Sequence, residues 1–104
     1  MVLNDKNRTR LNELVQMLRN DVVTKQDVVN TFGVDERTAR DMLSEIAKRC
    51  PLISVSDTKG YRIATSADDV GDAMHAFNEN QKRATEILKR NTPLQRFIFD
   101  NGDN

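Results

Sequence analysis

The chain has 104 residues, enough for one domain with at most an appendage, and its 16 basic and 16 acidic side chains cancel. This balance counts against a protein that coats nucleic acid without sequence preference. It is compatible with a sequence-specific DNA-binding protein that has a local basic patch. With one Cys, one His and no apolar run long enough to cross a bilayer, we expect a soluble, cytoplasmic protein without a disulfide, metal, cofactor or small-molecule ligand.

The first predicted element is a helix over residues 5–20. Its apolar side chains recur at i, i+3, i+4 and i+7 and form a stripe that another element must cover: Leu11, Leu14, Val15 and Leu18. Residues 21–23 then form a short link that could pair, as a strand, with a later hairpin.

Residues 24–49 predict two helices joined by a tight turn. Thr24 and Asp27 have the T-x-x-D spacing of a capping box at the start of the first helix. Gly33 stands at the turn because a residue without Cβ tolerates positive φ, and Asp35 is the expected N-cap of the second helix. The apolar sides of the two helices are expected to comprise Val28, Val29, Phe32, Ala39, Met42, Leu43, Ile46 and Cys50, with Pro51 ending the second helix.

The period changes to two after Pro51. Two alternating runs, Ile53 to Val55 and Tyr61 to Ile63, flank the turn residues 57–60 and predict a β-hairpin. A hairpin directly after a recognition-type helix is a wing. The predicted fold is therefore mainly α with a small β-hairpin: a winged helix-turn-helix over residues 1–65, followed by a long C-terminal helix.

The chain resembles a known family in two segments, T-K-Q-D-V-V-N-T-F-G-V-D-E-R-T-A-R-D-M-L and P-L-I-S-V-S-D-T-K-G-Y-R-I-A. They look like the winged helix-turn-helix of the biotin-operon repressor and its relatives, and also like small phage and prophage proteins with one further helix. The likeness covers roughly residues 8–65 and implies DNA binding. The second helix is more acidic than is usual in such readers, and no ligand-binding or catalytic domain follows the wing, so no effector or ligase role is implied.

Residues 66–104 are predicted to form a helical dimerisation arm with a frayed tail after residue 99. Ser66 and Asp69 are spaced as a second capping box for a helix over residues 67–90, and Pro93 then begins a short apolar segment. Such a helix is about 35 Å long, too long for the small domain to cover, so its stripe is expected to pack against a second copy. The polar Asn80 and Gln81 would help to fix the register. The predicted dimer interface comprises Val70, Met74, Phe77, Gln81, Ala84, Leu88, Leu94 and Phe97.

The outer line of the second motif helix supplies the expected base contacts. An Arg can pair with guanine, a Ser with several base edges, and a carboxylate with cytosine N4. The first turn of the preceding helix and the wing would contact backbone phosphates. The predicted DNA-binding residues are Lys25, Gln26, Arg37, Thr38, Arg40, Asp41, Ser44, Lys48, Lys59 and Arg62.

The same charged side chains have a second explanation as weak surface ion pairs, worth about 0.2–0.5 kcal/mol each. The pairs with i,i+4 spacing are Glu36–Arg40, Arg37–Asp41, Glu45–Arg49, Glu79–Arg83 and Glu86–Arg90. We expect a sequence-specific DNA-binding homodimer, either a transcriptional regulator or a phage-type accessory factor. The alternative is a winged-helix adaptor that binds protein and not DNA. An enzyme is not expected, because the sequence has no phosphate-binding glycine loop and its single His75 lies on a polar helix face.

Overall fold

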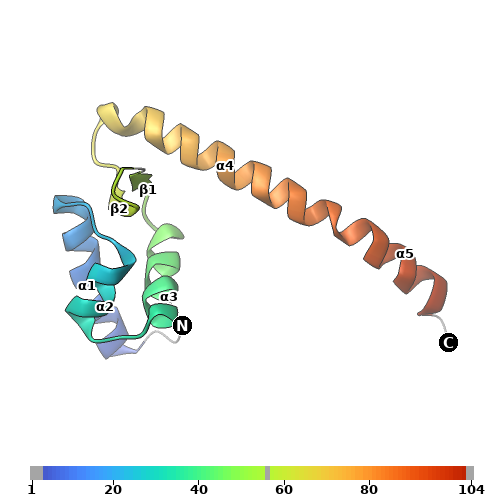
Figure 1. Cartoon of the computed structure of the whole chain (residues 1–104), viewed down its shortest axis with the longest axis horizontal. Coiled ribbons are helices and arrows are strands. Elements are labelled where there is room, and N and C mark those ends of the chain that lie inside the picture. Colours follow the sequence, from blue (N-terminus) through green and yellow to red (C-terminus); the bar gives the residue numbers. More distant parts are fainter. Residues whose placement is uncertain (1–3, 56, 103–104) are drawn as a thin grey trace. The chain divides into compact units, whose positions relative to one another are not determined.

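The computed structural model describes residues 4–55 and 57–102, and it is mainly helical with one antiparallel hairpin (Figure 1). The elements are α1 (Asp5–Asn20), α2 (Lys25–Phe32), α3 (Glu36–Ala47), β1 (Leu52–Val55), β2 (Gly60–Ile63), the 3-10 turn η1 (Ala67–Asp69), α4 (Val70–Lys89) and α5 (Asn91–Asn101). The expected mainly helical chain with a small hairpin and a long C-terminal helix is confirmed. The chain divides into two compact units, Met1–Ala73 and Met74–Asn104.

Local caps explain where α2 and α3 begin and end. Thr24 Oγ1 accepts from the Asp27 N–H at 3.1 Å while Asp27 Oδ2 accepts from the Thr24 N–H at 2.9 Å, which is the expected capping box. Gly33 ends α2 in the left-handed region, with φ 62° and ψ 38°. Asp35 caps α3 by accepting from the Thr38 N–H at 2.7 Å, and hydrogen bonding from Thr38 lowers the pKa of the Asp35 carboxyl.

The first three helices pack around one apolar core together with the hairpin (Figure 1). The buried faces are those expected from the helical and strand periods, and Val15, Val29, Phe32 and Cys50 lie half-buried at the core's edge. This burial is the main stabilising contribution to the first unit, since each fully buried aliphatic side chain contributes about 1.5–3 kcal/mol. The core residues are Leu11, Leu14, Leu18, Val23, Val28, Ala39, Met42, Leu43, Ile46 and Ile63.

The link between α1 and α2 pairs with the hairpin, as expected for a strand-like segment. Val23 and Tyr61 exchange two backbone hydrogen bonds of 2.8 Å each. The neighbouring Gly60 was expected in the turn, and this is wrong: it is the first residue of β2 and is buried. A Cβ on Gly60 would lie 2.4 Å from Val22 Cγ1, so glycine is needed for close approach, and Lys59 takes the positive φ of 55° instead.

The predicted capping box at Ser66 and Asp69 is also wrong. The Asp69 N–H donates to the Ser66 carbonyl at 3.0 Å and closes a 3-10 turn, so the Ser66 hydroxyl makes no cap hydrogen bond. The buried Asp69 carboxylate instead accepts from the Thr65 N–H at 2.8 Å and from the guanidinium of Arg62. The long helix α4 therefore begins three residues later than predicted, at Val70.

Helix α5 follows α4 after a single residue, Arg90, which keeps nearly helical angles of φ −69° and ψ −17°. Pro93 was predicted to be the first residue of this helix, but it is the third residue of α5. Because proline has no N–H, the Lys89 carbonyl loses its donor four residues on, which explains an interruption at this point. Asp100 belongs to α5, although it was expected in a frayed tail whose last two residues lie outside the described part. Within residues 4–55 and 57–102, no helix is long and apolar enough to cross a membrane.

Candidate nucleic-acid interface

Helix α3 has one buried side and one exposed polar side. The core holds Ala39, Met42, Leu43 and Ile46, which fixes the orientation of the helix. On the opposite side, the predicted base-contacting residues Arg37, Arg40, Asp41, Ser44 and Lys48 are all exposed, and Thr38 is half-buried. The structure thus brings Arg37, Arg40, Asp41 and Ser44 together on one accessible helix face.

The two arginines on this face are not held by the expected ion pairs. Glu36 reaches back across the turn, where its carboxylate lies 3.5 Å from Lys25 Nζ at the start of α2. Glu36 therefore does not pair with Arg40, and Arg37 does not pair with Asp41, within the part of the chain that the structure describes. Both guanidinium groups remain available to an outside acceptor.

The end of α3 is more strongly paired. Glu45 accepts a hydrogen bond from Lys48 Nζ at 3.1 Å, and Arg49 lies 3.8 Å from its other oxygen, so the expected Glu45–Arg49 pair is confirmed. The hydrogen bond from Lys48 and its positive charge lower the pKa of the Glu45 carboxyl.

The helix was expected to run to residue 49, but it ends at Ala47 with Lys48 as its C-cap. Beyond the cap, the Cys50 N–H donates to the Ile46 carbonyl at 2.8 Å. Pro51 disfavours helical geometry in Cys50 and has no N–H for the Ala47 carbonyl, so the helix cannot continue past this point. Lys48 therefore lies beyond the last regular turn of the proposed reading helix.

Arg62 was expected to be free to reach a phosphate, and this is wrong. Its guanidinium donates to Asp69 and lies 3.6 Å from the Asp72 carboxylate, with 28 % of the side chain exposed. The hydrogen bond between them raises the pKa of Arg62 and lowers that of Asp69. The contacts of Arg62 with Asp69 and Asp72 tie β2 to η1 and to the first turn of α4. The role of Asp69 was not predicted from the sequence, because its capping-box spacing with Ser66 suggested a purely local contact.

The remaining predicted phosphate contacts are a mixed group. Lys59 is exposed in the hairpin turn. Gln26 is exposed on the first turn of α2, where its Nε2 donates to Asn30 Oδ1 at 3.0 Å. Lys25 is half-buried and engaged with Glu36.

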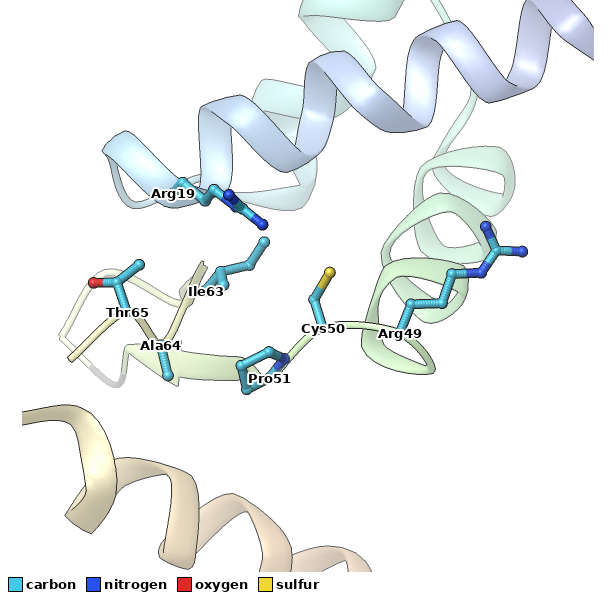
Figure 2. Close-up of a pocket in the computed structure, with 7 residues that line it drawn as sticks. All are labelled: Arg19, Arg49, Cys50, Pro51, Ile63, Ala64 and Thr65. Carbon is cyan, nitrogen blue, oxygen red and sulfur yellow. The ribbon is translucent and has the colours of Figure 1, made fainter. Parts of the chain in front are cut away.

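A pocket of about 410 Å³ lies elsewhere in the first unit, around the end of α1 and the start of β1 (Figure 2). In Figure 2 the Cys50 thiol points toward the end of α1, where Arg19 lies, while the Arg49 guanidinium points away from the thiol. Among the described residues, no His, Asp or Glu lines this pocket. Its lining residues are Arg19, Arg49, Cys50, Pro51, Ile63, Ala64 and Thr65.

Comparison with protein-family models, with curated proteins and with solved structures finds no match to this chain. The resemblance of residues 8–65 to the winged helix-turn-helix of the biotin-operon repressor therefore stays a prediction.

Proposed function

We propose that the first unit is a winged helix-turn-helix that reads double-stranded DNA with α3. The observation that carries the proposal is the pair Arg37 and Arg40. Both are exposed on a helix whose opposite side is held in the core, and neither forms an ion pair within the described residues. A rigid helix with free guanidinium groups suits recognition, because little orientational entropy is lost when it docks.

In this reading α3 enters the major groove. Arg37 and Arg40 pair with the O6 and N7 atoms of guanine, and Asp41 accepts from cytosine N4. The first turn of α2, with Gln26, and the hairpin turn, with Lys59, lie on the flanking phosphates and fix the register without reading sequence. Arg62 is left out of this set, because its engagement with Asp69 makes it part of the scaffold.

The balanced net charge determines how strongly such a protein is expected to bind DNA without regard to sequence. Sequence-independent affinity comes mainly from phosphate neutralisation, with a logarithmic salt slope of about −0.9 for each phosphate contact. A chain with equal numbers of acids and bases is therefore expected to bind random duplex weakly and a selected site much more tightly. The biological role supported by this behaviour is that of a regulator or a phage-type accessory factor that acts at specific sites.

The test begins with selection of bound sequences from a random duplex pool by the full-length protein at low salt. Affinity for the selected site is then compared between the natural protein and an Arg37→Ala/Arg40→Ala variant. Since one bidentate pair discriminates by about 1–3 kcal/mol, the double variant should lose roughly 100-fold in affinity and most of its sequence preference. A variant that binds the selected site as tightly as the natural protein would overturn the proposal.

A matched control separates base reading from loss of charge. Arg90→Ala/Arg96→Ala also removes two arginine charges, but from the residue before α5 and from α5 itself. It should change affinity for the selected site by less than about threefold, because neither side chain lies on the proposed reading face. An equal loss in both double variants would mean that net charge, and not α3, governs binding.

The second candidate is an adaptor that uses the same fold to bind a protein. The acids Glu36, Asp41 and Glu45 on and beside the exposed face of α3 favour it, since they repel phosphate. Absence of any shift with random or selected duplex at low salt would support the adaptor and exclude the DNA reader.

A further inference from the structure

The second unit, together with the start of α4, leaves large apolar side chains exposed. No residue of α4 or α5 is buried, and the large apolar side chains on these helices are between 50 % and 80 % exposed. A single helix cannot cover its own stripe, and a run of exposed apolar side chains this long marks an interaction surface. The residues are Val70, Met74, Phe77, Ile87, Leu88, Leu94, Phe97, Ile98 and Phe99.

The stripe on α4 repeats every seven residues, which is the period of paired helices. One line carries Val70, Phe77 and Ala84, and the adjacent line carries Met74, Gln81 and Leu88. Heptad spacing keeps both lines facing one partner along the whole helix. The occupant is therefore expected to be another helix and not a flat surface.

The charges of α4 are segregated along its axis. Its first half, residues 70–79, carries two acids and no Lys or Arg, whereas its second half, residues 80–89, carries three bases and one acid. The two halves thus differ in formal charge, at −2 and +2. A helix with ends of opposite sign is complementary to itself when the two copies run in opposite directions, and it repels itself when they run parallel in register. The residues are Asp72 and Glu79, then Lys82, Arg83, Glu86 and Lys89.

We propose that a second copy of this chain covers the stripe as an antiparallel helix pair centred on Gln81. With Gln81 on the twofold axis, Met74 lies level with Leu88 of the second copy, because each is seven residues from the centre. Glu79 lies level with Arg83 of the second copy by the same rule.

The polar Gln81 side chains at the centre of this helix pair can satisfy each other's hydrogen bonds. The two Gln81 amides meet at the axis and hydrogen-bond to each other, and such a polar pair within an apolar seam sets one register. Parallel pairing in register would instead place the two acidic halves of α4 side by side. The antiparallel dimer does not depend on DNA binding, so its success or failure is independent of the reading helix.

Sedimentation equilibrium of the full chain tests the association. The natural protein should be dimeric, and Phe77→Asp should raise the dimer dissociation constant at least about 30-fold, since a buried aromatic anchor is lost. The matched control Asn78→Asp adds the same charge one residue away, off the stripe, and should leave the constant unchanged. A natural protein that is monomeric at high concentration would overturn the proposal, whether its stripe is covered by its own first unit or by another protein.

Disulfide trapping tests the direction of the helices. In a Cys50→Ala background, a mixture of Met74→Cys and Leu88→Cys chains should form a mixed disulfide after mild oxidation, while Met74→Cys chains alone should not link. The Gln81→Cys chain should link to itself, which confirms that the oxidation works. Self-linking of Met74→Cys without the mixed product would show parallel helices and overturn the antiparallel assignment.

Discussion

Replacing Gly33 by Ala isolates the backbone of the turn between α2 and α3. Gly33 has φ 62° and ψ 38°, and a Cβ added to it would meet no atom within 4 Å. The cost of Gly33→Ala is therefore the intrinsic strain of a left-handed residue, about 1–2 kcal/mol, with no contribution from crowding. The smaller entropy of the unfolded alanine chain offsets about 0.4–1 kcal/mol of this, which leaves a net loss near 1 kcal/mol. In a domain of this size the melting temperature should fall by roughly 4–8 °C.

Gly71→Ala is the matched control for this measurement. Gly71 lies in α4 and also has open space around its Cβ position, but its backbone is helical. The same added methyl should be neutral or stabilise the protein by up to about 1 kcal/mol, because alanine favours helix. Urea unfolding followed by far-UV circular dichroism gives both values, and the m-value should stay unchanged. If Gly33→Ala were as stable as the natural protein, the left-handed turn and the helix orientation that depends on it would be refuted.

Three further predictions test the rest of the first unit. Gly60→Ala should destabilise the hairpin, because the new methyl would lie 2.4 Å from Val22 Cγ1; Val22→Ala in the same chain should recover part of the loss in urea unfolding, and strictly additive losses would contradict this contact. The pKa of Asp69 is lowered from 3.8 by Arg62, so its stabilising contribution is complete above about pH 4 and is lost as the pH falls below that value. Asp69→Asn should therefore flatten the fall in stability between about pH 4 and pH 2, and an equally steep fall would count against the pair. Leu14→Ala should cost about 2–5 kcal/mol by chemical denaturation, since Leu14 is fully buried, and a loss below 1 kcal/mol would mean that the core is loosely packed.

Much of the first unit could be predicted from the sequence, because its signals act within one helical turn. The capping box of Thr24 and Asp27, the left-handed Gly33 and the cap at Asp35 each involve groups three or four residues apart. The periods of apolar residues likewise identified the buried faces, since burial follows from which side of an element is apolar. The same helical period of apolar residues predicted the exposed face of α3 and therefore its candidate DNA contacts.

The tertiary structure decided the features in which a side chain had more than one possible partner. Glu36 was within reach of Arg40 along its own helix, yet the turn brings Lys25 closer to it. Arg62 was free by its local sequence, but the chain folds back after β2 and presents the Asp69 carboxylate to it. Gly60 was expected in the turn from its local sequence. The pairing of Val23 with Tyr61 instead places Val22 against it, which requires a glycine there. Caps and periods depend only on the chain's own geometry over a few residues, so the sequence alone determined them. Ion pairs and close approaches depend on which elements the core brings together, and only the folded arrangement decides that.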